Sequence, residues 1–345
     1  MTLSPPNRLR LDGGTLLANW RWLAQRSGPA ACGAAVKADG YGLGAREIVS
    51  RLARAGCRDF FVATWAEAAA LMPLPDGATL SVLHGVRAED MPLAITSQAR
   101  PVLNTPEQVR RWHEAGDRAC DVMIDTGINR LGLSPAETGL LTGLQIETLM
   151  SHLACADEDV PQNGEQRTAL IEVAQGVPHR RLSLANSAGV CLGSDYAFDL
   201  TRPGVALYGG VPRREGEGNL RQVAFPEAQI LQRRVVHAGD RVGYSGIWTA
   251  PCETPIAILN IGYADGVLRS FSNRGQAFAG HIALPFVGRV SMDLIAIDIS
   301  AAPDLSEGDW VTIDYDLPRA AAASGLAQYE LLTGLGDRFE RVWTD

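Results

Sequence analysis

Residues 31–56, ACGAAVKADGYGLGAREIVSRLARAG, contain a short apolar run that ends in a lysine and is followed by an amphipathic, alanine-rich segment. This order recurs along the chain to about Gly204. Parallel strands that are joined by crossover helices produce such an alternation. The apolar runs number eight and lie at 31–37, 60–65, 79–85, 100–104, 121–127, 148–154, 181–187 and 198–204. Eight strand-helix units predict a closed (β/α)8 TIM-like barrel.

The sequence pattern changes after residues 210–223, GVPRREGEGNLRQV, which are rich in glycine and arginine. The segments that follow are rich in valine, isoleucine and turn residues, and they lie at 230–244, 254–266, 280–300 and 308–314. Such segments are typical of strands that are separated by turns. We therefore predict an α/β chain with a barrel domain at residues 1–222 and a second, mainly β C-terminal domain at residues 223–345.

Charge and composition narrow the possible partners. The 345 residues include 31 Lys and Arg against 39 Asp and Glu, which gives a net charge of −8 and a pI of about 5.3. Such a chain lacks the basic surface that binds nucleic acids or anionic membranes. No apolar run approaches the roughly 18 residues of a membrane span, and the first residues, MTLSPPNRLRLDGG, lack the apolar part of a signal peptide. We therefore expect a cytoplasmic protein with neither a nucleic acid nor a membrane as its partner.

In a barrel of this type, functional side chains gather at the C-terminal ends of the strands. The polar residues at the predicted strand ends are Lys37, His84, Asn104, Asp125, His152, Asn186, Ser187 and Arg202. Lys37 ends an apolar strand, and a desolvated lysine loses its proton more readily and can form a Schiff base with an aldehyde or carbonyl group. A lone lysine can also extend its amine into solvent, and on this motif alone that simpler interpretation stays open.

Two further turns contain candidate binding residues. Gly204, in TRPGVALYG, can present backbone N–H groups to a phosphate, and Ser187, in ANSAG, can add a hydroxyl, although a serine that begins a helix is often only an N-cap. Tyr263, in NIGYADG, would be exposed for chemistry, although Ala-Asp-Gly is also a common hairpin turn. His152 precedes the acidic run 157–159, which we interpret as a solvated loop, so no metal site is predicted.

Seven motifs carry a resemblance to a known family. In chain order they are AVKADGYG, DTGINRLG, SHLACADE, LANSAG, RPGVALYG, GYADG and VGRVSMD. The series resembles that of the alanine racemases, which are barrel-type enzymes dependent on pyridoxal 5'-phosphate. It extends from about Ala34 to Asp293 and spans both predicted domains. The resemblance replaces the simpler interpretations of Lys37 and Tyr263.

The resemblance implies a two-base mechanism at the α-carbon of an amino acid. Lys37 matches the lysine that binds the cofactor aldehyde as a Schiff base and acts as acid or base on one face of the substrate. Tyr263 matches the acid-base group of the opposite face. In the family this tyrosine comes from the other subunit of a homodimer, so the resemblance implies that two subunits share each active site.

The remaining site residues are also carried over from motif positions. Arg202 matches the residue that hydrogen-bonds the pyridine nitrogen, and a guanidinium there keeps that nitrogen unprotonated. His152 would link Tyr263 to Arg202. The other cofactor-binding positions, mostly around the phosphate, are Tyr41, Asn186, Ser187, Gly204 and Val205. The substrate-binding positions are Arg130 and Met292, which match groups that contact the substrate carboxylate, and Asp293, which would order the site.

Two positions depart from the family pattern. Several members have a carbamate-modified lysine before the Asp-Thr-Gly motif that supports the arginine, whereas this chain has Met123. Many members have a tyrosine near the C-terminus that lines the substrate pocket, whereas this chain aligns Asp337 there. Another support must therefore orient Arg130, and a smaller polar residue could relax the restriction to alanine.

We therefore expect an alanine racemase that interconverts L-alanine and D-alanine and supplies D-alanine for peptidoglycan. The alternative within the same mechanism is a serine-accepting or broad-specificity amino-acid racemase. A single-barrel pyridoxal-phosphate carrier protein is a hypothesis from another class, but it has no second domain. A barrel-type decarboxylase needs an acidic group at the pyridine nitrogen, and Arg202 argues against it.

Overall fold

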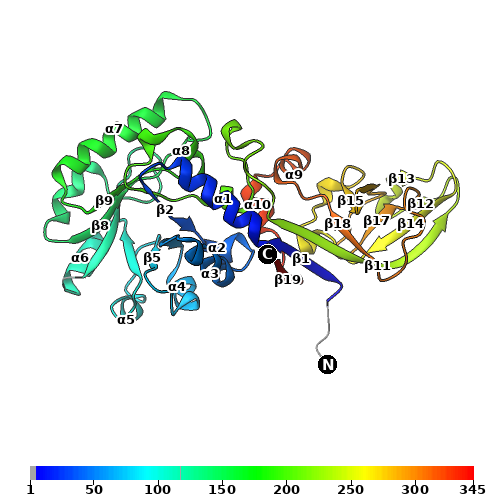
Figure 1. The fold of residues 1–345 in the computed structure, drawn as a ribbon, viewed down its shortest axis with the longest axis horizontal. Coiled ribbons are helices and arrows are strands. Elements are labelled where there is room, and N and C mark those ends of the chain that lie inside the picture. The colour runs from blue at the N-terminus through cyan, green and yellow to red at the C-terminus, as the bar shows by residue number, and fades with distance from the viewer. Residues whose placement is uncertain (1–4, 117) are drawn as a thin grey trace. The chain divides into compact units, whose positions relative to one another are not determined.

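The computed structural model describes residues 5–116 and 118–345, and this part of the chain divides into two compact units. One unit comprises Leu16–Arg221, and the other comprises the residues up to Thr15 together with Gln222–Asp345. Figure 1 shows the elements of each unit. The two units are described separately below.

The first unit is built on parallel strands that are nearly all buried. A seven-stranded parallel sheet follows chain order, and its strands are β3 (Ala34–Ala35), β4 (Asp59–Val62), β5 (Thr79–Val82), β6 (Arg100–Leu103), β7 (Ala119–Met123), β8 (Gln145–Met150) and β9 (Arg181–Ser183). Strands β2 (Ala31–Cys32) and β10 (Leu200–Thr201) pair with each other in parallel. Only Gly33 separates β2 from β3, so we treat these two strands as one extended segment.

Hydrogen bonds from both edges of the sheet reach the segment around β10. On one side, Gly33 N donates to Thr201 O (2.9 Å) and Ala35 N donates to Pro203 O (2.8 Å). On the other side, Arg202 N donates to Ala185 O (2.8 Å). The eight predicted strand segments therefore form a closed ring, and the predicted (β/α)8 barrel is confirmed.

Helix α1 precedes the first barrel strand, and the other helices follow barrel strands and lie around them, as α6 and α7 do in Figure 1. Their bounds are α1 (Gly13–Arg26), α3 (Ala45–Ala55), α4 (Trp65–Leu71), α5 (Met91–Ala94), α6 (Pro106–Glu114), α7 (Pro161–Gly176) and α8 (Ser187–Cys191). The N-cap of α6 is Thr105, whose side chain accepts a hydrogen bond from Gln108 N. No helix in the described ranges is long and apolar enough to cross a membrane.

The second unit is mainly β, as predicted. Its eight-stranded sheet contains β1 (Asn7–Asp12), β11 (Ala224–Val236), β14 (Thr254–Leu259), β15 (Gln276–Ala279), β16 (Ile282–Pro285), β17 (Ile295–Asp298), β18 (Trp310–Ile313) and β19 (Glu340–Thr344). A short hairpin pairs β12 (Arg241–Val242) with β13 (Trp248–Thr249). Two helices, α9 (Leu317–Ser324) and α10 (Gln328–Thr333), precede the last strand.

The N-terminal strand differs from the predicted domain division. Strand β1 was expected in the barrel domain of residues 1–222, but it pairs antiparallel with β11 and parallel with β19 in the second unit. Leu9 and Leu11 of β1 are fully buried, which follows the alternation of a strand with one face in a core. Arg8 and Arg10 both form ion pairs with the buried Glu227 of β11, and these contacts add to the backbone pairing.

Candidate active site

Lys37 begins an unusual left-handed turn at the end of the first barrel strand. The short helix α2 (Lys37–Tyr41) has φ values of 52° at Ala38, 51° at Asp39, 64° at Gly40 and 58° at Tyr41. Left-handed backbone costs a non-glycine residue about 1–2 kcal/mol. Such strain persists only where surrounding contacts hold it, and it is concentrated at functional sites.

Two carboxylates hold this turn. Glu67 of α4 accepts hydrogen bonds from Ala38 N (2.6 Å) through Oε1 and from Ala63 N (2.7 Å) and Thr64 N (3.1 Å) through Oε2. Asp39 Oδ1 accepts from Ala45 N (2.8 Å) at the start of α3. The backbone that directly follows Lys37 is therefore fixed to α4 by Glu67 and to α3 by Asp39.

The Lys37 amine lies in an environment that disfavours its charge. The side chain is half-buried, and burial lowers the pKa of its amine. The Arg130 charge lowers this pKa further, while the Glu67 charge opposes the shift. A larger fraction of the amine is therefore unprotonated at neutral pH than in an ordinary lysine, as nucleophilic chemistry requires. Lys37 is also the only lysine in the chain.

A polar cradle lies beside this turn. Ser187 Oγ accepts hydrogen bonds from Gly204 N (2.8 Å) and Ala206 N (3.2 Å). A Cβ atom at Gly204 would lie 2.2 Å from the Tyr41 hydroxyl, so a side chain at this position would displace the Tyr41 ring. Two hydroxyls and two backbone N–H groups thus meet within a few ångströms, which is the donor set that binds a phosphate.

The neighbours of the cradle are fixed by local contacts. The Asn186 side chain accepts from Gly189 N (2.9 Å) and forms the N-cap of α8, and Val205 begins the buried 3-10 turn Val205–Tyr208. The Tyr41 ring packs against Tyr208 with 4.9 Å between the ring centroids, and Tyr208 donates to Ala35 O (2.8 Å). These contacts connect the cradle to β3, the strand that precedes Lys37.

Arg202 places a buried positive charge at the end of the last barrel strand. The residue is 6% exposed, and its guanidinium donates to Ser183 Oγ and to Ser151 O. Burial lowers the pKa of Arg202 to about 10, and the negative charge of Asp121 opposes this shift. Arg202 is therefore charged at neutral pH and can only donate hydrogen bonds.

His152 lies near three positively charged side chains, those of Arg202, Arg130 and Lys37. Burial and the charges of Arg202, Arg130 and Lys37 lower the pKa of His152 to about 3. The imidazole is therefore neutral at physiological pH. The structure thus brings four of the predicted site residues to the C-terminal end of the barrel strands.

The other predicted residues lie together in the second unit. Tyr263 begins the 3-10 turn Tyr263–Asp265 and is 39% exposed, and Met292 and Asp293 lie in an adjacent turn. Tyr263 N donates to Ser291 O (3.0 Å), and Ala264 N donates to Met292 O (3.1 Å). The two turns are therefore joined by their backbones and present one surface.

Comparison with known proteins decides the family. Residues 11–212 match the model of the alanine racemase N-terminal domain, and residues 223–343 match the model of the C-terminal domain. The chain belongs to the alanine racemase family. The resemblance inferred from the seven motifs is thereby confirmed.

Individual relatives agree over nearly the whole chain. A catabolic alanine racemase of Agrobacterium fabrum is 42% identical, over 97% of this chain and 91% of the relative. An alanine racemase of Methylobacterium nodulans is 40% identical, over 100% of this chain and 98% of the relative. A crystal structure of the Bartonella henselae alanine racemase with covalently bound pyridoxal phosphate is 35% identical, with a TM-score of 0.89 over 98% of this chain and 99% of that one.

In this member of the alanine racemase family, the loop that carries Arg130 is held by helix α7 and by an Asx turn. Met123, which departs from the family pattern expected from the sequence, is buried in β7. Asp125 Oδ1 accepts hydrogen bonds from Gly127 N (2.9 Å) and Asn129 N (3.1 Å), and this turn shapes the loop that carries Arg130. Asp125 N also donates to Leu133 O (2.9 Å) at the base of the loop.

Gln166 of α7 connects this loop to His152. The side chain is buried, and its Nε2 donates to His152 O (3.0 Å) and to Thr126 Oγ1 (3.3 Å), while Oε1 accepts from Ala154 N (2.9 Å). Neither Gln166 nor Glu67 was predicted as a site residue. The Thr64-x-x-Glu67 pattern is a capping box that the sequence shows, whereas no local motif signals the contact of Glu67 with Ala38 N or of Gln166 with His152 O.

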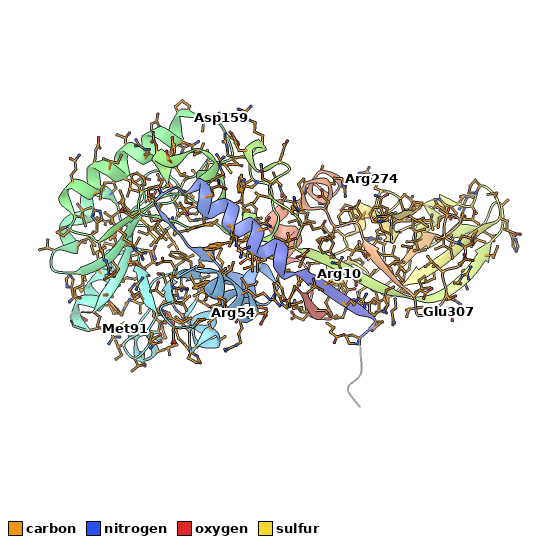
Figure 2. All side chains as sticks on the ribbon, in the orientation of Figure 1. Arg10, Arg54, Met91, Asp159, Arg274 and Glu307 are labelled. Carbon is orange, nitrogen blue, oxygen red and sulfur yellow. The ribbon has the colours of Figure 1, made fainter. Side chains whose placement is uncertain are left out.

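The acidic run after His152 forms an ion pair with an arginine of the same unit. Asp159, which is labelled in Figure 2, forms an ion pair with the buried Arg213, whose Nη1 also donates to Ala156 O (3.0 Å). Among the described residues, no group of three or more His, Cys, Asp and Glu side chains could hold a metal ion.

Glu67→Gln is expected to destabilise the alanine racemase barrel and to loosen the Lys37 turn. The carboxylate accepts three N–H groups, whereas an amide offers one acceptor oxygen and turns an NH2 group toward a donor. A donor left without a partner costs about 1–3 kcal/mol. Chemical unfolding should show a loss of this size relative to Glu89→Gln, which changes an exposed loop carboxylate. Equal unfolding free energies for the two variants would mean that Glu67 does not hold the turn.

Proposed function

We propose that this chain interconverts L-alanine and D-alanine with two acid-base groups, Lys37 and Tyr263 of the partner subunit, on opposite faces of the α-carbon. The chain is an isomerase of the alanine racemase family, and its cofactor is pyridoxal 5'-phosphate. The observation that carries the proposal is the Lys37 amine, which has a lowered pKa and lies among Arg130, His152 and Arg202.

The residues of the barrel unit fit this cofactor. The hydroxyls of Tyr41 and Ser187 and the backbone N–H groups around Gly204 form the donor set that a phosphate needs. Arg202 can donate to the ring nitrogen, and Lys37 can bind the aldehyde. When bound, the cofactor supplies a conjugated ring that makes the α-proton of an amino acid acidic. Because a guanidinium can only donate hydrogen bonds, Arg202 would leave the ring nitrogen unprotonated and would limit side reactions that need a stronger electron sink.

Racemisation requires a base on one face of the α-carbon and an acid on the other, with the roles exchanged in the reverse direction. The Lys37 amine can take or return the proton on one face, and the Tyr263 phenol can do so on the other. His152 is neutral and carries a ring nitrogen that can accept a hydrogen bond from a phenol or a guanidinium. Arg130 and the backbone N–H of Met292 would bind the substrate carboxylate, and Asp293 would order the site.

A homodimer with shared active sites is part of this proposal. Tyr263 and Met292 are exposed on the second unit, and Tyr244 and Leu294 of the same unit are also exposed large apolar side chains. Large exposed apolar groups commonly mark a surface that a protein partner covers. A second copy of the chain would cover these side chains, and Tyr263 of one subunit would enter the barrel site of the other.

Substrate choice is tested by comparing alanine with serine. Asp337 is exposed and lies just before β19, where many family members have a tyrosine of the substrate pocket. With pyridoxal phosphate added, the purified protein should abolish the optical activity of L-alanine. Polarimetry with each substrate then gives kcat/KM for L-alanine and for L-serine, and the two values are compared. Serine turnover below about a hundredth of alanine turnover, or about 2.7 kcal/mol of discrimination, would exclude the serine-accepting alternative. Comparable rates would establish it.

The biological role stays a prediction. D-alanine for peptidoglycan is the role expected from the family, whereas the Agrobacterium fabrum relative is named as catabolic. Both roles use the same reaction at the same site. A cytoplasmic location likewise stays a prediction.

A further inference from the structure

Arg338 binds two carboxylates of the second unit at once. Its Nε and Nη2 donate to the two oxygens of Asp265, each at 2.8 Å, and its Nη1 donates to Asp293 Oδ1 at 2.6 Å. All three nitrogens of the guanidinium are thus used. A planar fork of this kind binds carboxylates with fixed geometry, which the point charge of a lysine cannot reproduce.

One of these carboxylates is fully buried and belongs to the Tyr263 turn. Asp265 is 0% exposed and lies two residues after Tyr263, and its Oδ2 also accepts a hydrogen bond from Gly262 N (3.0 Å). A buried carboxylate without a counter-charge is strongly destabilising. The two carboxylates raise the pKa of Arg338, so the guanidinium remains charged and serves as this counter-charge.

The other carboxylate belongs to the turn that carries Met292. This turn packs directly against the Tyr263 turn, since a Cβ atom at Gly262 would lie 2.3 Å from Met292 O. The chain segment before Arg338 also packs against the Tyr263 turn, since a Cβ atom at Gly336 would lie 2.8 Å from Ala264 O. Tyr315 fixes the end of the turn by donating to Gly266 O (3.0 Å). Three segments that are distant in sequence therefore meet at one guanidinium.

We propose that Arg338 is a positioning residue for racemisation, which sets the direction of the Tyr263 phenol relative to the Met292 backbone N–H group. The inference rests on the proposed function, because it assigns Tyr263 and Met292 the roles given above. Arg338 itself does not touch the reacting atoms. It holds the proton-transfer group and the carboxylate-binding group as one rigid unit, and a displacement of about 1 Å in such a group can reduce turnover about 100-fold.

The test compares three variants. Arg338→Lys keeps a positive charge near Asp265 but cannot span both carboxylates, and Arg338→Gln removes the charge. The control is Arg319→Gln, which removes an arginine of the same unit that pairs with Asp314 and Asp316 away from the two turns. For Arg338→Lys we expect an unfolding midpoint near that of the wild type, unchanged cofactor absorbance, and a kcat at least tenfold lower with little change in the KM for alanine. Arg319→Gln should keep the wild-type kcat.

A second readout does not depend on activity. With 3-fluorotyrosine incorporated, the 19F resonance of Tyr263 is assigned by its loss in Tyr263→Phe. Arg338→Lys should shift or broaden this resonance, and Arg319→Gln should not. An unchanged resonance together with a wild-type kcat in Arg338→Lys would overturn the inference. If the wild-type protein racemises no amino acid, the proposed function fails, while the 19F comparison still decides whether Arg338 holds the Tyr263 turn.

Discussion

Lys37→Ala is expected to lose both covalent cofactor binding and racemisation. The amine is the proposed attachment point of the cofactor and the base for one face of the substrate, so no other group can replace it. We expect kcat to fall at least about 1,000-fold, within the range that loss of a positioned acid-base group causes. Racemisation is measured by polarimetry, and bound cofactor by the visible absorbance of the protein after gel filtration.

The composition of the chain makes this test unusually clear. Lys37 is the only lysine, and all the other residues among the 31 Lys and Arg are arginines. Borohydride reduction of the cofactor-loaded protein should therefore give one side-chain adduct, which mass spectrometry places at Lys37. Lys37→Ala should give none. A variant that keeps the adduct, or that racemises alanine at the wild-type rate, would mean that the cofactor is attached elsewhere.

Tyr263→Phe is expected to keep the cofactor but to lose racemisation. The change removes one hydroxyl from a side chain that is 39% exposed, so the fold of the second unit should be unaffected. The loss of the proton-transfer group on one face should lower kcat about 100-fold to 10,000-fold. Cofactor absorbance and the borohydride adduct at Lys37 should be those of the wild type.

The matched control for this variant is Tyr329→Phe. Tyr329 is 45% exposed in α10 of the same unit and is not among the proposed site residues. Its replacement should leave kcat unchanged. Near-normal turnover by Tyr263→Phe would refute the assignment of this tyrosine as the second base.

The barrel could be predicted from the sequence because its strands contain short apolar runs, such as residues 60–62 in β4, which are buried. Strand β1 was placed in the wrong unit, because its alternating pattern shows that one face is buried but not which sheet buries it. The partner strands β11 and β19 lie more than 200 residues further along the chain. Such long-range pairing is not visible in local periodicity.

In the candidate site, too, residues within contiguous motifs could be predicted, whereas residues that act through distant contacts could not. Lys37, Arg202 and the glycine turns lie in contiguous motifs, so their positions could be recognised. The left-handed conformation of Ala38 and Asp39 could not, because non-glycine residues ordinarily avoid positive φ. Glu67 and Arg338 were also missed, since they form hydrogen bonds with segments that lie 29 and 73 residues earlier in the chain.

The most direct test of the account is a hybrid dimer of the two inactive variants. Lys37→Ala and Tyr263→Phe chains with different affinity tags are coexpressed, and the heterodimer is isolated by two successive affinity steps. If Tyr263 of the partner subunit completes each site, the heterodimer contains one site with both groups intact and one site with neither. We expect about half of the wild-type activity per dimer. A heterodimer that is no more active than the two parent variants would contradict a two-base site shared between subunits.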